Sequence, residues 1–402
     1  MSGCLFLLLT ACSSYFTAAL LLKCVSPARR LDSPLLGPEA MPRPSYPDLV
    51  EDIAGPRLRL LAEIGVVGSC FGSLVAILHV IYTVVPNAVW HHGGSGGGYE
   101  GLCFVFALSF GVILALSLLK DLTSLRFVGF LCVGANGFTF VVIGLRFFFG
   151  HYVKAWPDVL HGVTTMTNQQ IWLNTDQPAK MLTAIPIFTQ IFNAHWVLLP
   201  LFSELRDPTR GRMAVVTGRS LAITSGLYLF SGLLGYLTWL EHTQSNVLLD
   251  FARRDGLMMA ARCLVTIAAT CSCPAVVMVL RQMLGKMGHK WRHQEGEGER
   301  GEAPEEGEEG YVCRFMLSAV LLLSCTTLAV FVPGLDVAFG LTGSFTASII
   351  IYIVPGLLYL RLDPVDEALG VTRGCRCLAA LCVVWGVVMG VVCSGYIIIT
   401  NS

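Results

Sequence analysis

The sequence predicts an all-α polytopic membrane protein, and three observations lead to that fold class. Apolar residues make up 54% of the 402 residues and charged residues only 13%, about half of the charged share that is usual in soluble domains. The apolar residues gather in long runs, and a run of about 20 can cross a bilayer as a helix. The runs are continuously apolar, whereas the strands of a membrane barrel alternate apolar and polar residues.

Ten such runs follow one another along the chain, and their boundaries carry an error of about two to four residues. In order, they are Cys4–Cys24, Ile64–Val85, Gly101–Leu119, Phe127–Phe149, Leu182–Phe202, Ser220–Trp239, Leu257–Leu280, Phe315–Val332, Asp336–Leu360 and Leu378–Ile399. Together they form a single transmembrane domain over residues 1–402, with the lipid bilayer as its surroundings.

The distribution of basic residues predicts the orientation of the spans. Five alternate connections hold 21 Lys and Arg residues, while the intervening connections hold 4. Positive residues favour the cytoplasmic side, so the five basic connections are expected there. This assignment places Met1 outside and makes Cys4–Cys24 run inward. We therefore expect one further helix ahead of the first span.

Two connections on the predicted cytoplasmic side are unusually long. Residues 26–59 form a Pro-rich, basic loop, and residues 294–310 contain eight Glu and five Gly. The second segment cannot bury apolar surface and is expected to be disordered. Both segments are candidates for binding cytoplasmic protein partners.

Several classes of function are excluded by composition and motifs. The 27 basic residues balance the 27 acidic ones, whereas a nucleic-acid binder needs a basic surface. The 15 Cys lack the paired spacing of a zinc site, so no metal site is expected. No nucleophile elbow, P-loop or metalloprotease motif is present, so the protein is not expected to be an enzyme.

The span Leu182–Phe202 carries polar residues near its centre, including Thr189, Asn193 and His195. Polar groups at that depth are costly unless they face a cavity or a partner. Two interpretations remain open: a transporter helix that is broken at a binding site, or a proline-kinked helix whose polar groups bond to neighbouring helices.

The span Leu257–Leu280 carries Thr270 and Ser272 shortly before Pro274. Their hydroxyl oxygens suit a hard cation such as Na⁺, but hydroxyls in membrane helices also bond to their own backbone carbonyls. Small residues in Asp336–Leu360, such as Gly340 and Gly343, indicate close helix packing.

Motifs over nearly the whole chain resemble one family of transporters. The segment AIPIFTQIFNAHWVLLPLFSELRDPTRGRM (184–213) is similar to the sixth helix and following loop of the amino acid/auxin permease family, in its branch of sodium-coupled neutral amino acid transporters. Further matches occur in order at Ser45-Tyr46 to Ala54-Gly55, Gly235-Tyr236-Leu237-Thr238, Arg262 to Pro274, and Val354-Pro355-Gly356 to Arg361.

The resemblance implies a leucine-transporter-like fold of two inverted five-helix repeats plus one helix. The ten spans then match family helices two to eleven, and the first family helix is missing. The substrate would lie at Thr189, Phe192, Asn193, Ala194 and His195, and the coupling ion at Thr270 and Ser272. No cofactor is implied beyond that ion, which the sequence does not identify as Na⁺ or H⁺.

The leading hypothesis is a secondary active transporter of neutral amino acids. It would work by alternating access, in the plasma membrane or in an endolysosomal or vacuolar membrane, and it would be inactive without the first helix. The alternative is a non-transporting membrane sensor or regulatory pseudo-transporter that binds partners through residues 26–59 and 294–310.

Overall fold

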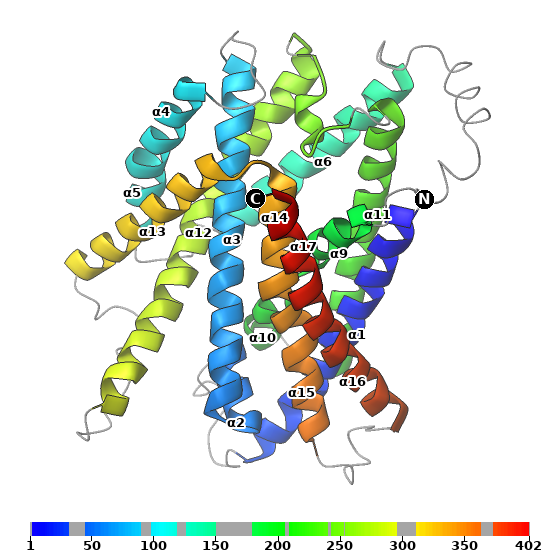
Figure 1. The fold of residues 1–402 in the computed structure, drawn as a ribbon, viewed down its shortest axis with the longest axis vertical. Coiled ribbons are helices and arrows are strands. Elements are labelled where there is room, and N and C mark those ends of the chain that lie inside the picture. The colour runs from blue at the N-terminus through cyan, green and yellow to red at the C-terminus, as the bar shows by residue number, and fades with distance from the viewer. Residues whose placement is uncertain are drawn as a thin grey trace. The chain divides into compact units, whose positions relative to one another are not determined.

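The protein was studied as a computed structural model. The structure describes residues 2–31, 45–89, 98–118, 126–149, 179–205, 209–239, 243–252, 254–295, 311–362 and 373–401. These residues are almost entirely helical and contain no strand (Figure 1). The acidic segment from 296 to 310 and residues 32–44 of the Pro-rich loop lie outside the described residues.

Ten helical segments of the described chain are long and apolar enough to cross a membrane, which confirms the ten predicted spans. Three of them extend well beyond the predicted ends: Pro56–Pro86, Arg210–Trp239 and Gly256–Gly288. In each case the helix continues into Arg- or Lys-containing sequence, because these residues are good helix formers and need no apolar surroundings. An apolar run therefore marks the part of a helix that fits the membrane, and not the end of the helix.

The chain divides into two compact units, which are described separately. Unit 1 comprises Met1–Ser69, Met166–Leu229 and Phe339–Ser402, and unit 2 comprises Cys70–Thr165 and Phe230–Ala338. Three helices continue from one unit into the other: α3 (Pro56–Val89), α11 (Arg210–Trp239) and α14 (Leu335–Thr342).

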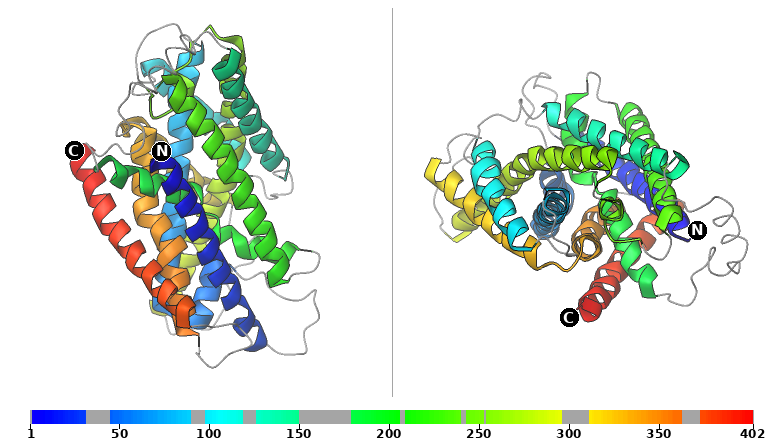
Figure 2. Two further views of the ribbon diagram at one scale, coloured as in Figure 1. Left: turned by 90° about the vertical axis from the view of Figure 1, so that its right-hand side faces the viewer. Right: turned by 90° about the horizontal axis from the view of Figure 1, so that it is seen from above.

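Unit 1 is built from the two ends of the chain and a central segment. Its helices are α1 (Ser2–Leu31), α2 (Tyr46–Ala54), α9 (Ala179–Ile191), α10 (His195–Glu204), η5 (Gly343–Ala347), η6 (Ile349–Ile353), α15 (Val354–Arg361), α16 (Arg373–Val388), η8 (Met389–Cys393) and α17 (Ser394–Asn401). Figure 2 shows α1 beside α11, where the ring of Tyr15 reaches the backbone at Gly218. Residues distant in sequence thus form one core.

Unit 2 contains α4 (Gly98–Leu108), η1 (Ser109–Ile113), α5 (Leu114–Ser117), α6 (Arg126–Phe149), η4 (Val247–Leu249), α12 (Gly256–Glu295) and α13 (Tyr311–Phe331). Two clusters of buried apolar residues hold it together. One surrounds Leu74, Leu78 and Ile81 of α3, and the other joins Val142 and Ile143 of α6 to Met258 of α12.

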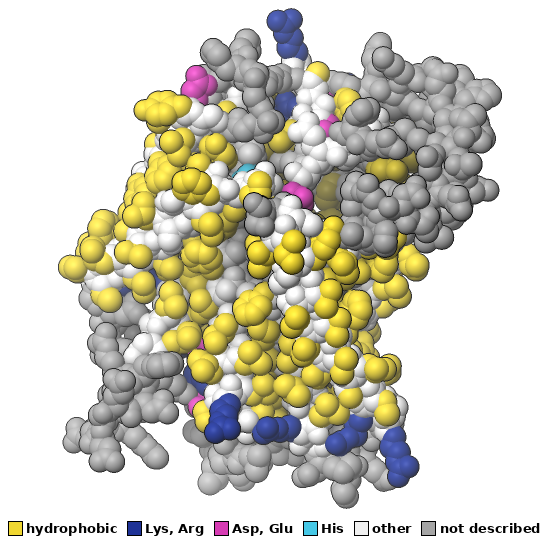
Figure 3. Space-filling view, viewed as in Figure 1, with side chains coloured by type: hydrophobic (Ala, Val, Ile, Leu, Met, Phe, Trp, Pro, Cys, Tyr) yellow, Lys and Arg dark blue, Asp and Glu magenta, His cyan; other side chains and the backbone are white. Residues whose placement is uncertain are grey.

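Hydrophobic side chains are spread over the described surface that faces the viewer in Figure 3, and Lys and Arg side chains gather at its lower edge. Large apolar side chains such as Phe130 (76% exposed) and Val133 (74% exposed) are left mostly uncovered by the described protein. A soluble protein does not expose apolar surface of this extent without a partner. The described surface therefore fits the lipid bilayer that the composition predicts.

The Pro-rich loop contains a helix that the sequence analysis did not predict. α2 begins after Ser45, whose side chain accepts from the Asp48 backbone N–H, while Asp48 accepts from the Ser45 backbone N–H. This reciprocal pair is a capping box, and Pro47 suits the first turn because it needs no N–H there. The predicted loop over residues 26–59 is therefore partly helical, because it contains α2 and because α1 continues to Leu31.

The ninth span contains two π-helical segments, η5 and η6, on either side of Ser348. π-Helical turns are uncommon, and they widen a helix locally. η5 packs against α9, and a Cβ placed on Gly343 would clash with the carbonyl oxygen of Pro186. The close packing predicted for this span is present at Gly343, where glycine allows one backbone to touch another.

Candidate functional site

The fifth span is interrupted within unit 1 at residues 192–194, between α9 and α10. Ala194 has φ −113° and ψ 3° and caps α10 without a side-chain hydrogen bond. Pro186 and Pro200 both lie inside helices, so the interruption is not a proline kink. The break lies at residues that the family resemblance assigned to the substrate, and it agrees with the first of the two interpretations of this span.

Two hydroxyl groups of α1 bond to the interrupted segment. The Ser14 hydroxyl donates to the Phe192 carbonyl oxygen at 3.2 Å. Thr17 Oγ1 lies 3.0 Å from His195 Nε2, and its own proton goes to the carbonyl of Ser13 or Ser14 at 3.0 or 3.1 Å. Thr17 therefore accepts from His195 Nε2–H. In a neutral imidazole the other nitrogen, Nδ1, is then an acceptor.

Ser69 on α3 holds the other side of the break. Asn193 Nδ2 donates to Ser69 Oγ at 2.7 Å, and Gln190 Nε2 donates to the same oxygen at 3.4 Å. The carbonyl oxygen of the Asn193 side chain is buried and has no hydrogen-bond partner among the described residues. His195 Nδ1 is in the same situation, in a side chain that is 2% exposed.

The remaining candidate residues around the break differ in their surroundings. Thr189 is buried, donates to the Ile185 carbonyl at 3.0 Å and lies 3.6 Å from Met389 Sδ. Phe192 packs in an apolar cluster with Leu7 and Ala11, and its ring lies 6.2 Å from the ring of Tyr228. Ala194 is exposed. Thr189 and Phe192 thus belong to the packing of unit 1, while Ala194 marks an accessible point of the break.

The chemistry of this arrangement follows from the two unpartnered acceptors. A buried acceptor without a donor costs about 1–3 kcal/mol, and such a cost is usually offset by a ligand, an ion or water. Asn193 and His195 both present acceptors beside an uncapped helix interruption. A hydrogen-bond donor such as an ammonium group would satisfy these acceptors.

The two candidate ion-binding residues lie on α12 in unit 2. Thr270 donates to the Thr266 carbonyl at 2.8 Å, and Ser272 donates to the Ala269 carbonyl at 2.8 Å. The backbone bonding considered in the sequence analysis is thus present. It uses the hydroxyl protons and leaves the oxygen lone pairs for a cation. Pro274 has no N–H, so the carbonyl oxygen of Thr270 also lacks its helical donor.

Sequence reasoning did not find the α1 residues that bond to the break. Thr10, Ser14 and Thr17 are buried on one face of α1, and Ser13 bonds to Tyr352 Oη of η6 at 2.9 Å. Their positions repeat every three or four residues, which is the period of one helix face. Hydroxyl groups at this spacing within an apolar run would have indicated a polar partner, which for Ser14 and Thr17 is the fifth span.

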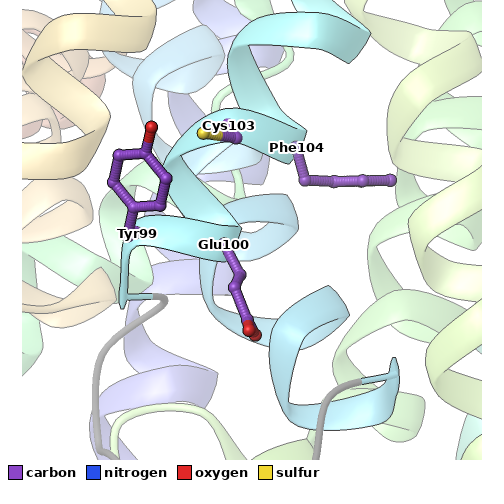
Figure 4. A pocket seen from close by; sticks show the side chains of 4 residues that line it. All are labelled: Tyr99, Glu100, Cys103 and Phe104. Carbon is purple, nitrogen blue, oxygen red and sulfur yellow. The ribbon is translucent and has the colours of Figure 1, made fainter.

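Within the described chain, no group of three or more His, Cys, Asp or Glu residues could hold a metal ion. A surface pocket of about 390 Å³ lies at the start of α4 beside Tyr99, Glu100, Cys103 and Phe104. Figure 4 shows Tyr99 and Cys103 on one side of this helix and Glu100 directed away from them. These side chains do not converge on a common point, so this pocket is not a candidate binding site.

Comparisons with known proteins bear on the whole chain. The family model described as "Transmembrane amino acid transporter protein" matches residues 1–400. A relative, the sodium-coupled neutral amino acid symporter 2 of Danio rerio, is 25% identical over 323 residues. The matched region covers 76% of this chain and 60% of the relative.

The family match fits the structure in two respects. Family membership implies a multi-pass integral membrane protein, and the described residues supply ten helices suited to that role. The family is also one of transporters and not of enzymes. This chain belongs to the family of transmembrane amino acid transporter proteins.

Proposed function

We propose that this protein is a secondary active transporter that moves neutral amino acids by alternating access, with Na⁺ or H⁺ as the coupling ion. The observation that carries this proposal is the interruption of the fifth span at residues 192–194. Interrupted helices in transporters offer backbone groups and side chains to a substrate within the membrane.

The polarity of the break supports an amino acid as the substrate. The acceptors Asn193 Oδ1 and His195 Nδ1 suit an ammonium group, while the backbone N–H groups at the start of α10 suit a carboxylate. The zebrafish relative is named as a symporter of neutral amino acids. No charged side chain bonds to Asn193 or His195 in the described residues, and this fits a neutral substrate side chain.

Coupling to Na⁺ is supported by the oxygen atoms of α12. The Thr270 hydroxyl, the Thr270 carbonyl released by Pro274 and the Ser272 hydroxyl are hard oxygen ligands within three residues of one helix. Hard cations prefer such oxygen ligands. Proton coupling is the other outcome of the experiment, because His195 is a titratable group at the break.

The test is uptake of radiolabelled alanine and glutamine by the full-length protein in proteoliposomes, with an inward Na⁺ gradient, an inward proton gradient or no gradient. Gradient-driven uptake is expected. Asn193→Ala should lower uptake at low substrate concentration by about 10- to 100-fold, the equivalent of one hydrogen bond to a charged group. Asn136→Ala is the matched control, since Asn136 is exposed on α6 and donates only to the Cys132 carbonyl one turn earlier.

The absence of uptake of any neutral amino acid under either gradient would overturn the proposal. It would favour the alternative, a non-transporting sensor that binds cytoplasmic proteins through residues 26–59 and 294–310. Stable binding of a cytoplasmic protein to these segments, without flux, would support that alternative.

A further inference from the structure

A cavity of about 510 Å³ lies in unit 2, away from the interrupted span in sequence and in unit. Its walls are one face of α3, the segment before and within η4, and the connection from α13 to α14. The basic-residue pattern assigns these ends of α3 and α13 to the outer side of the membrane. The size falls within the range of about 300–1,000 Å³ that is usual for small-molecule sites.

One wall of the cavity presents a buried acceptor. His79 is 6% exposed, and its Nδ1 lies 2.8 Å from the carbonyl oxygen of Ala329. A carbonyl can only accept, so Nδ1 carries the proton. Nε2 of the neutral imidazole is then an acceptor. This bond to α13 fixes both the tautomer and the orientation of the ring.

Negative charges and carbonyl groups lie beside the cavity. Val330, Phe331 and Val332 line it at the end of α13, where the carbonyl groups of a helix carry partial negative charge. Two carboxylates contact lining residues: Asp250 accepts from the Gln244 backbone N–H at 3.2 and 3.3 Å, and the Asp336 side chain lies against Gly334. None of the described residues that line the cavity is Lys, Arg, Asp or Glu.

The rest of the lining is apolar or aromatic. Leu249 and Leu335 join the α13 residues as hydrocarbon surface. The ring of Tyr82 lies 6.2 Å from the His79 ring, tilted by 53°. Aromatic faces attract cations that are held near them.

We propose that this cavity binds an organic ammonium ion that carries an apolar group. The ammonium group meets His79 Nε2 and the carbonyl end of α13, and the apolar group lies against Leu249, Leu335 and Phe331. Anions are disfavoured, because the helix end and both nearby carboxylates repel them. The proposal does not rest on the proposed transport function, since no residue of the interrupted span is among the described residues that line this cavity.

The test is to measure, by calorimetry, the binding of 2-phenylethylammonium to the purified full-length protein in nanodiscs. Two probes of similar shape serve as comparisons: neutral 2-phenylethanol and anionic 3-phenylpropionate. The ammonium probe is expected to bind at least 10-fold more tightly than the alcohol and more tightly still than the anion. Equal affinity for the three probes, or no binding of the ammonium probe, would overturn the proposal.

Variants locate the binding. Ser245→Trp places a large ring into the cavity and should abolish binding, whereas Ser220→Trp, at an exposed position of α11, should leave it unchanged. Asp336→Asn keeps the shape but removes a negative charge and should weaken binding of the ammonium probe by about 3- to 10-fold, without affecting the alcohol. This second variant decides the matter if Ser245→Trp does not fold. The proposal would be contradicted if Asn193→Ala abolished binding while Ser245→Trp retained it, or while Asp336→Asn left it unchanged. Either result would place the amine at the interrupted span.

Discussion

The hydroxyl group of Thr17 and the imidazole of His195 are joined by a hydrogen bond of 3.0 Å between Oγ1 and Nε2. Thr17 is fully buried on α1, and His195 is the first residue of α10. The bond attaches the second half of the interrupted span to another helix at the point where α10 begins. It also sets the tautomer of His195 and so determines that Nδ1 faces its surroundings as an acceptor.

Thr17→Val should destabilise the protein. Valine has nearly the same shape but no oxygen, so the buried His195 Nε2–H loses the Thr17 oxygen as an acceptor, at a cost of about 0.5–1.5 kcal/mol. Thr17→Ser is the matched control, because it retains the hydroxyl group. Unfolding in detergent should show the loss for valine and a smaller effect for serine. Equal stability of the two variants would mean that the bond contributes little to folding.

Gly343→Ala should disrupt unit 1 more than a glycine-to-alanine change in a helix usually does. A Cβ at Gly343 would clash with the Pro186 carbonyl oxygen, so η5 and α9 would have to separate. Overpacking of this kind typically costs about 1–3 kcal/mol. Gly395→Ala, on α17, is the control, because nothing lies within 4 Å of a Cβ there. Thermal unfolding of the two variants compares them directly, and equal melting temperatures would contradict the close contact.

Much of the fold was predictable from the sequence, because a membrane helix is specified by a local property. The run Phe127–Phe149 differs from the observed Val128–Phe149 by one residue, since composition alone decides that segment. α2 also had a local signal in Ser45 and Asp48, which the proline content of the loop concealed. The π-helical segments η5 and η6 had no such signal. They depend on contacts with distant segments such as α9, which no local pattern reports.

The site was predictable only in part, because it too depends on contacts between segments that are distant in sequence. Polar residues within the fifth span indicated an interruption, and Thr189, Phe192 and Asn193 lie at or near it. The partners Ser69 and Thr17 come from other helices. Ser69 is one of two serines in the apolar run Ile64–Val85, and only the folded chain brings it to Asn193.

Tyr46 should make stability depend on alkaline pH. Its hydroxyl donates to the Ile350 carbonyl at 2.9 Å, and burial raises the pKa of this phenol well above its ordinary value of about 10. The folded state therefore keeps the proton that the unfolded state releases. The stabilisation is fully present below about pH 10 and declines as pH rises above that value towards the folded pKa.

Tyr46→Phe tests this behaviour. At neutral pH the variant should be less stable by about 0.5–1.5 kcal/mol, because a hydrogen bond is lost. Between about pH 10 and 11.5 its stability should fall less steeply than that of the wild type, so that the two curves approach each other. Chemical unfolding measured across this range gives both curves. Parallel curves would show that Tyr46 ionises as readily in the folded state as in the unfolded state.

Thr270→Val should raise the Na⁺ concentration needed for half-maximal uptake by about 10-fold or more, if the transporter is coupled to Na⁺. Valine keeps the shape but removes one oxygen ligand from a hard cation. Thr266→Val is the matched control, because Thr266 lies one turn earlier and donates to the Arg262 carbonyl in the same way. Equal Na⁺ dependence in both variants would exclude the Thr270 hydroxyl from the ion site.

Arg262→Lys should loosen the connection between α11 and α12. Arg262 is 1% exposed, and its guanidinium group donates to the carbonyl of Leu248 at 3.0 and 2.8 Å and to that of Phe251 at 2.6 Å. A lysine ammonium cannot reproduce this planar set of donors to two carbonyls. Loss of even one such charged hydrogen bond costs about 1.5–3 kcal/mol, so η4 should open more often.

The amides of Leu249 and Asp250, which bond within this segment, should then exchange with deuterium about 10- to 100-fold faster. Arg254→Lys, at an exposed position of the same connection, should leave the exchange unchanged, and similar rates in both variants would show that Arg262 does not hold η4 in place.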